Sequence, residues 1–190
     1  MINNNYKTVG ERQRYVQKSG EEWENFVRDK VNKKLKELSS DPKVIKGNSI
    51  PKGSTLWEKL AIPVGKPGST QKIWGDIDLV VVDKLNNPIA VISCKTSLHG
   101  RFSETLFYAL VLKELVPGLK VPFATPDKGR QQKGPWQSEW GSEEKPTKDR
   151  LLGSHYLDGI YVENKNTKLG GMVKSLDCLA GDLIGWYKIR

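Results

Sequence analysis

Two acidic residues and a lysine stand at the ends of two apolar segments. Asp76 and Asp78 lie at the head of IDLVVV (77–82), and Lys95 directly follows IAVISC (89–94). Carboxylate oxygens are ligands that Mg²⁺ prefers, and a bound divalent ion polarises a phosphate and helps to form hydroxide. An ammonium group stabilises negative charge in the transition state. These residues therefore suit metal-dependent hydrolysis of a phosphodiester, although a structural ion pair at a sheet edge uses the same residue types.

The two apolar segments are predicted to be neighbouring antiparallel strands in the middle of a sheet. Both are rich in β-branched residues and are apolar on both faces. The segment between them, DKLNNP (83–88), is a typical turn sequence in which Pro88 opens the second strand. We expect the turn to be centred on Asn86 and Asn87.

This turn would bring the polar residues to one face of the sheet. It pairs Asp78 with Lys95 and Val80 with Ser93. Because successive side chains of a strand point to opposite faces, Asp78, Ser93 and Lys95 share a face, and Asp76 points the same way. Charged groups in such a place are rarely there for packing, since their removal from water is costly unless they are paired or bind an ion.

An amphipathic helix is predicted on each side of this hairpin in the sequence. The first spans 20–38, with Ser19 as its cap, and the second spans 103–115, with Ser103 as its cap. The apolar stripe of the first helix consists of residues at three- and four-residue spacing: Trp23, Phe26, Val27, Val31, Leu35 and Leu38.

The rest of the chain gives weaker signals. YLDGIYVE (156–163) predicts a further strand, and residues 172–188 predict a closing helix that is interrupted near Gly181. A length of 190 residues suits a single domain over 1–190, with 20–115 as its core.

The sequence GDIDLVVV, followed after a gap by ISCK, resembles the PD-(D/E)xK nuclease motif. The predicted helix–strand–strand–helix order over 20–115 also matches the core of that superfamily. The resemblance implies an α/β fold with a restriction-endonuclease-like core, in which helices flank a mixed central β-sheet. It also implies Mg²⁺ as the cofactor, Asp78 as a metal ligand, and Lys95 as the residue that orients water or stabilises charge on the phosphate.

The same resemblance suggests further acidic residues of the site. In many members of the superfamily the first helix contributes a Glu, and Glu24 is the best candidate here, ahead of Glu21 and Glu22. Asp76 is an additional candidate metal ligand. A Glu on the first turns of a helix is also a common solvated residue, so both interpretations of Glu24 stay open.

The chain departs from the motif at Ser93, where the second acidic residue is expected. A serine cannot replace a charged metal ligand, although its hydroxyl or carbonyl oxygen could contribute to the site. Some type II restriction endonucleases that cut CCGG-containing sites have a Ser there and take the acid from the following helix, which makes Glu104 a candidate catalytic and metal-binding residue. The alternative is a first-turn Glu that the helix dipole favours. The run from Ser93 to Leu112, SCKTSLHGRFSETLFYALVL, is most similar to enzymes of the BsaWI type.

Candidate DNA contacts occur in two places. Thr96, Ser97 and Arg101 follow Lys95 and would lie near the phosphate backbone, where a guanidinium pairs well with phosphate oxygens. The long polar insertion 126–150 is a candidate DNA-recognition loop, because its glutamines could read adenine and its arginine guanine. Its candidate residues are Lys128, Arg130, Gln131, Gln132 and Lys133. The alternative for this insertion is a solvated surface loop.

The composition restricts the class of protein and its surroundings. Arginine and lysine number 31 against 22 acidic residues, which gives a formal charge of +9 and favours a polyanionic partner. Cys94 and Cys178 form no metal or disulfide pattern. There is no apolar run long enough to cross a membrane and no secretory signal. We therefore expect a cytoplasmic protein with no membrane partner.

Together these features predict a Mg²⁺-dependent type II restriction endonuclease that cuts double-stranded DNA at a short specific sequence. A homodimer is expected, since a palindromic target matches a two-fold axis, and a DNA methyltransferase would be its companion in the cell. Two alternatives stay open. One is a structure-specific or repair nuclease of the same fold, similar to a Holliday-junction resolvase. The other is a non-catalytic DNA-binding module, which Ser93 keeps possible.

Overall fold

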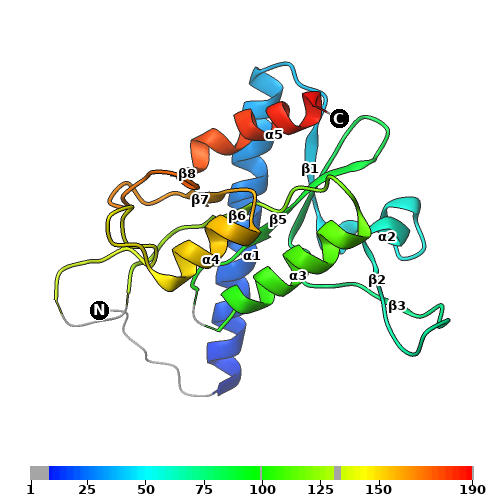
Figure 1. Ribbon diagram of the computed structural model, residues 1–190, viewed down its shortest axis with the longest axis horizontal. Coiled ribbons are helices and arrows are strands. Elements are labelled where there is room, and N and C mark those ends of the chain that lie inside the picture. The colour runs from blue at the N-terminus through cyan, green and yellow to red at the C-terminus, as the bar shows by residue number, and fades with distance from the viewer. Residues whose placement is uncertain (1–8, 99, 131–133, 190) are drawn as a thin grey trace.

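The computed structural model describes residues 9–98, 100–130 and 134–189, and it is a mixed α/β structure (Figure 1). The helices are α1 (Val9–Glu37), α2 (Thr55–Leu60), α3 (Phe102–Leu115), α4 (Lys148–Tyr156) and α5 (Leu179–Lys188), with short 3₁₀ helices η1 (Gly47–Ser49) and η2 (Leu176–Cys178). The strands are β1 (Lys43–Lys46), β2 (Ile62–Pro63), β3 (Lys72–Ile73), β4 (Leu79–Val82), β5 (Pro88–Cys94), β6 (Phe123–Thr125), β7 (Ile160–Val162) and β8 (Val173–Ser175).

Six of these strands form one mixed sheet in the order β1-β4-β5-β6-β7-β8. The pairs β1/β4 and β4/β5 are antiparallel, whereas the pairs β5/β6, β6/β7 and β7/β8 are parallel. The predicted mixed central sheet is therefore confirmed. Strands β2 and β3 form a separate small antiparallel pair.

Helices cover both faces of the large sheet (Figure 1). On one face α1 and α5 pack on Leu79, Val81 and Ile92. On the other face α2 and α3 pack on Val80 and Val91, and α3 also covers the parallel half of the sheet. Alternation along β4 and β5 thus gives each face its own apolar core, which is why both strands are apolar throughout.

The β4–β5 hairpin is present, but its predicted register is wrong. Val80 lies opposite Val91, where Ser93 was expected, and the pairing is irregular between Val81 and Val82. The turn is wider than a two-residue turn, since Val82 pairs with Pro88. The Asp83 side chain stabilises it by accepting the N–H groups of Leu85 and Asn87. The shift is an even number of residues, so the side chains of the regularly paired residues keep their predicted faces.

The first helix is longer than predicted and its stripe is narrower. Helix α1 begins at Val9, so Ser19 lies within it and does not cap it. Trp23, Val27, Val31 and Leu35 are buried, whereas Phe26 and Leu38 are largely exposed. Of the predicted stripe, only this i, i+4 row of four is buried against the sheet, because a helix that lies on a flat sheet buries one narrow stripe.

Helix α3 agrees with the prediction except at its start. It begins at Phe102, so Ser103 is already helical and Arg101 occupies the N-cap position without a side-chain cap bond. Towards the end of the chain, the predicted closing helix is divided into β8, η2 and α5. Gly181 lies inside α5 and does not interrupt it.

Candidate active site

The Lys95 ammonium group lies between two carboxylates. Its Nζ is 2.6 Å from Asp76 Oδ2 and 2.9 Å from Asp78 Oδ2. The side chain of Lys95 is 5% exposed and that of Asp78 is 9% exposed, whereas Asp76 is 36% exposed. The cluster is thus closed behind Asp78 and open to solvent beside Asp76. Cys94, which is not a site residue, points to the opposite face of the sheet and packs in the core beneath α1, as alternation along the strand predicts.

The backbone fixes these residues from three sides. Asp78 Oδ2 accepts the Cys94 N–H at 2.6 Å, so the head of β4 is tied to the end of β5. The Asp78 carbonyl accepts the Gly47 N–H at 2.9 Å, and the Lys95 N–H donates to the Ala124 carbonyl at 3.1 Å. Asp78 and Lys95, which flank β4 and β5, are thus held by backbone bonds to the end of β5, to Gly47 after β1 and to β6, whereas Asp76 comes from the segment that leads into β4.

The charges in the cluster depend on one another. Burial alone would lower the pKa of Lys95, but the negative charges of Asp78 and Asp76 outweigh burial and raise this pKa. Lys95 therefore stays protonated at neutral pH. Burial raises the pKa of Asp78, with Lys95 acting in the opposite direction. Such perturbed, buried charges are typical of functional sites, although structural ion pairs show them too.

Helix α1 adds a third carboxylate. Burial and the nearby negative charge of Asp78 raise the pKa of Glu24 to about 6, although Lys46 and Lys95 oppose this rise. The helix is held in place by the adjacent Trp23, whose Nε1–H donates to the Ala124 carbonyl at 3.1 Å. That carbonyl also accepts the Lys95 N–H. Glu24 therefore belongs to the electrostatic surroundings of Asp78, and its role as a metal ligand stays a prediction.

Ser93 and Glu104 are placed differently. Ser93 is buried, and its Oγ lies 2.9 Å from Thr105 Oγ1 on α3, so its hydroxyl joins β5 to that helix. Glu104 is exposed on the first turn of α3. The charges that act most strongly on Asp78 come from Lys95 and Asp76, and Glu104 is not among them.

The donor atoms of this cluster suit Mg²⁺. Asp76, Asp78 and Glu24 offer only carboxylate oxygens, which are the ligands that this hard ion takes. Within the described ranges, no group of three or more acidic, histidine or cysteine side chains is arranged as a metal site. Mg²⁺ is often held by one or two protein carboxylates together with water and substrate phosphate, and the pair that now binds Lys95 fits that pattern.

The predicted DNA contacts lie partly around this cluster. Thr96 and Ser97 are half-buried directly after Lys95, and Arg101 is exposed at the start of α3. Lys128 and Arg130 are exposed on the long insertion. The other three candidates of the insertion, Gln131, Gln132 and Lys133, lie outside the described residues.

Two features of the site were not predicted. Lys46 on β1 binds Glu21 at 3.1 Å and contributes to the field at Glu24. In the insertion, Asp127 and Glu139 are buried, whereas neither interpretation of this polar segment, a DNA-recognition loop or a solvated surface loop, predicts buried acidic residues. The sequence DKG gives a signal for Asp127, because an Asp two residues before a Gly favours an Asx turn. Nothing in the sequence distinguishes Lys46 or Glu139 from ordinary surface residues.

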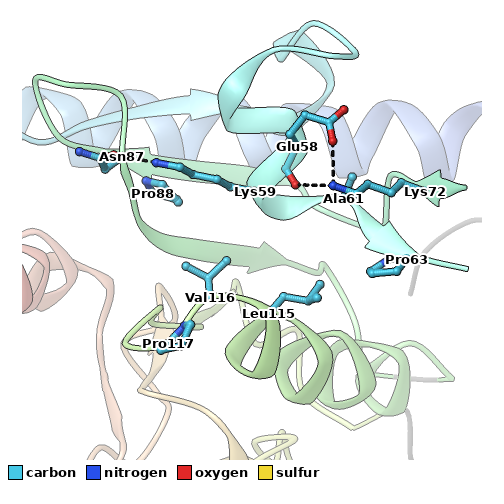
Figure 2. Close-up of a pocket in the computed structure, with 10 residues that line it drawn as sticks. All are labelled: Glu58, Lys59, Ala61, Pro63, Lys72, Asn87, Pro88, Leu115, Val116 and Pro117. Atoms are coloured by element: carbon cyan, nitrogen blue, oxygen red, sulfur yellow. Dashed lines mark hydrogen bonds and ion pairs between the residues drawn. The ribbon is translucent and has the colours of Figure 1, made fainter. Parts of the chain in front are cut away.

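A cavity of about 470 Å³ lies at the other end of β5 (Figure 2). Pro88 at the start of β5, Pro63 and Val116 contribute to its walls. Its charged rim is already paired, because Lys72 binds Glu58 at 2.7 Å and Lys59 donates to Asn87 at 2.8 Å. Neither Lys95 nor Asp76 nor Asp78 lines the cavity, so it is separate from the Lys95 cluster.

The architecture is shared with solved restriction endonucleases. The chain superposes on AgeI, solved as a specific complex with DNA, with a TM-score of 0.69 and 16% identity over 95% of this chain and 71% of AgeI. It superposes on BsaWI, solved as a pre-specific complex with DNA, with a TM-score of 0.57 and 12% identity over 95% of this chain and 65% of BsaWI. At these identities the comparison shows the fold.

Sequence comparison gives the family. The model of the family "BsaWI restriction endonuclease type 2" matches residues 49–178, and the chain belongs to this family. A curated relative from Methanocaldococcus jannaschii, named "Putative type II restriction enzyme MjaVIP", is 33% identical over 114 residues, or 57% of this chain and 48% of the relative. The chain thus spans about half the length of that relative. In the described part of the chain, no helix is long and apolar enough to cross a membrane.

Proposed function

We propose that this chain is a Mg²⁺-dependent endonuclease that cuts double-stranded DNA at a short specific sequence, as a type II restriction enzyme. The observation that carries the proposal is the convergence of Lys95, Asp76 and Asp78 at one end of the sheet. Membership of a restriction endonuclease family supports the same reaction. The net charge of +9 favours a polyanionic substrate.

Each residue of the cluster has a role in this proposal. Asp78 and Asp76 would hold Mg²⁺, with Glu24 as a further acidic group. When bound, the ion would polarise the scissile phosphate and lower the pKa of a water ligand. Lys95 orients the attacking water or stabilises the charge that develops on the phosphate, and the Cys94 N–H keeps Asp78 in place for Lys95.

The proposed partners follow from the substrate. AgeI and BsaWI were each solved with DNA, and double-stranded DNA is the partner proposed for this chain. A homodimer would place two such clusters on the two strands of a palindromic site. A companion DNA methyltransferase would protect the cell's own copies of that site, which requires both proteins to act in the cytoplasm where the DNA is.

Plasmid cleavage with and without Mg²⁺ tests the proposal. We expect discrete fragments with Mg²⁺, and a loss of at least a thousandfold in cleavage rate for Lys95→Ala and for Asp78→Asn, because each removes charge at the reacting phosphate. Lys84→Ala and Asp29→Asn change exposed residues of the same types and should cut normally. Circular dichroism and DNA binding of each variant separate lost chemistry from lost folding.

The same assay decides between the proposal and its alternatives. Nicking that follows DNA structure rather than sequence would identify a resolvase-like or repair nuclease. Binding of DNA without cleavage by Mg²⁺ or Mn²⁺ would identify a non-catalytic module. Undiminished cleavage by Lys95→Ala and Asp78→Asn would contradict the site assignment.

A further inference from the structure

Asp127 is a buried carboxylate at the base of the insertion. It is 0% exposed and accepts four hydrogen bonds, from the Gly129 N–H at 3.3 Å, the Glu139 N–H at 3.0 Å, the Ser138 hydroxyl at 2.6 Å and the Thr167 hydroxyl. These bonds join three segments: the outgoing arm of the insertion, its returning arm and the β7–β8 connection. Asp127 is therefore the point at which the insertion closes on the fold.

This closing point is tied to the strand that holds Lys95. Asp127 follows β6, and its N–H donates to Thr125 Oγ1 at the end of that strand. The preceding residue of β6, Ala124, accepts the Lys95 N–H at 3.1 Å. The base of the insertion and the Lys95 backbone are thus held by the same short strand.

Glu139 supplies a second connection. It is 6% exposed, its N–H is held by Asp127, and its Oε1 accepts the Leu98 N–H at 3.2 Å. Leu98 lies in the segment directly after Lys95. The returning arm of the insertion is therefore joined to the backbone on the far side of Lys95 as well.

The two arms of the insertion also bind each other. The Arg130 N–H donates to the Gln137 carbonyl at 2.8 Å, and Trp136 Nε1–H donates to the Lys128 carbonyl at 3.2 Å. The exposed side chains of Lys128 and Arg130 thus project from a backbone that is fixed at its base and across its width.

Anchoring alone would not need a carboxylate. Trp140 in the same insertion already packs against Phe102 and Phe123, with ring centroids 5.4 and 5.6 Å apart. A buried carboxylate is costly unless its oxygens are hydrogen-bonded, but its bonds are directional, which apolar packing is not. The four bonds to Asp127 fix where the insertion leaves the sheet, not only that it stays attached.

From this arrangement we propose that Asp127 and Glu139 form a positioning clamp that determines sequence specificity. The clamp holds Lys128 and Arg130 at a fixed position relative to Lys95, so that contacts of the insertion with one particular DNA sequence place the scissile phosphate at the Lys95 cluster. Asp127 and Glu139 do not contact the DNA themselves. They act by holding the backbone that carries Lys128 and Arg130, and are therefore positioning residues. The inference rests on the proposed function and deepens it, because it assigns discrimination between DNA sequences to a site in the fold.

The test removes the hydroxyl donors of the clamp and leaves the charged residues in place. In the double variant Ser138→Ala/Thr167→Val we expect discrimination between the target and single-base variants, as a ratio of kcat/KM, to fall at least about tenfold, because a misplacement of about 1 Å can cost about a hundredfold in rate. The kcat on the target should stay within about threefold. Thr167→Val alone should also lower discrimination, whereas Thr167→Ser keeps the hydroxyl donor to Asp127 and should retain it. Ser142→Ala and Thr70→Val are matched controls outside the clamp.

Hydrogen exchange separates the outcomes. Faster exchange at residues 128–130 and 134–137 together with reduced discrimination supports the clamp. Faster exchange with unchanged discrimination overturns it and leaves Asp127 a structural anchor, as would equal losses of discrimination in Thr167→Ser and Thr167→Val. A protein that cuts no DNA before any substitution would overturn the proposed function, and the clamp's role in specificity with it, whatever the exchange data show.

Discussion

At the residue scale, the buried Lys95 is the most informative side chain of the protein. A lysine that is 5% exposed loses most of its hydration, and Asp76 and Asp78 together replace it. Two carboxylates that share one ammonium group are also ready to share a divalent ion, because both cations satisfy the same oxygens. The cluster thus has the charge balance of a stable ion pair, and its carboxylates are the groups that the proposed Mg²⁺ would use.

The identity of the remaining acid can be decided by two matched substitutions. We predict that Glu24→Gln lowers the cleavage rate at least a hundredfold at saturating Mg²⁺ and raises the Mg²⁺ concentration needed for half-maximal rate, because Glu24 lies in the field of Asp78. Glu104→Gln should retain near-normal values of both. The reverse result would assign the role to Glu104, as in the CCGG-type enzymes.

Asp158 gives a pH-dependent prediction away from the site. Burial alone would raise its pKa, but Lys113 at 2.7 Å, the Val121 N–H and Lys120 at 3.2 Å outweigh burial and lower it. A lowered pKa stabilises the folded state above the unfolded pKa of about 4. Asp158→Asn should therefore lower the free energy of unfolding by about 2 kcal/mol at pH 7.

The pH series checks the sign of this effect. The difference between Asp158→Asn and the unmutated protein should shrink as the pH falls below about 4, where Asp158 becomes protonated when unfolded and then when folded. Urea unfolding at pH 7 and pH 3 measures it. An equal difference at both pH values would contradict the ionic origin.

At the element scale, the position of Asp78 depends on the contact between β1 and the start of β4. Gly47 follows β1, and its N–H donates to the Asp78 carbonyl. A Cβ at Gly47 would lie 1.9 Å from the Ile77 carbonyl oxygen, so no other residue fits without moving the backbone. Because Gly47 has no side chain, the backbone that follows β1 comes close enough to hydrogen-bond Asp78 and hold it in place.

Gly47→Ala should therefore disturb both fold and site. We predict a loss of about 2 kcal/mol in the free energy of unfolding, together with a cleavage rate reduced at least tenfold in protein that is still folded. Gly20→Ala is the matched control, because nothing lies within 4 Å of its Cβ position in α1. It should stabilise the helix by about 0.5–1 kcal/mol and leave cleavage unchanged. Equal behaviour of the two variants would contradict the close contact at Gly47.

At the scale of the whole molecule, the excess of positive charge predicts how binding depends on salt. The affinity for DNA should fall steeply, by about a thousandfold between 50 and 200 mM salt if six or more phosphates are contacted. Arg101→Ala should reduce the slope by about one unit, since it removes one phosphate contact. Lys59→Ala, at the cavity on the far end of β5, should leave the slope unchanged. Fluorescence anisotropy with labelled duplex measures both slopes.

Local sequence patterns were sufficient to predict the two central strands, the helices on either side of them and the shared face of Asp78 and Lys95. These follow from local patterns, because β-branched runs and i, i+4 spacing act over a few residues. The even register shift between β4 and β5 preserved the shared face even though the pairing itself was wrong. The family resemblance, which was carried by the same residues, agreed with the fold and the family match.

The other groups that surround that face are brought there by the packing of distant elements and could not be predicted from local patterns. Glu24 lies near Asp78 because α1 crosses the sheet there. Ser93 forms a hydrogen bond with Thr105 because α3 packs on the opposite side of β5. Asp127 becomes a buried anchor through Ser138 and Thr167, which are distant in the sequence. Such contacts depend on how whole elements are oriented, and a local pattern carries no information about the orientation of an element that lies elsewhere in the chain.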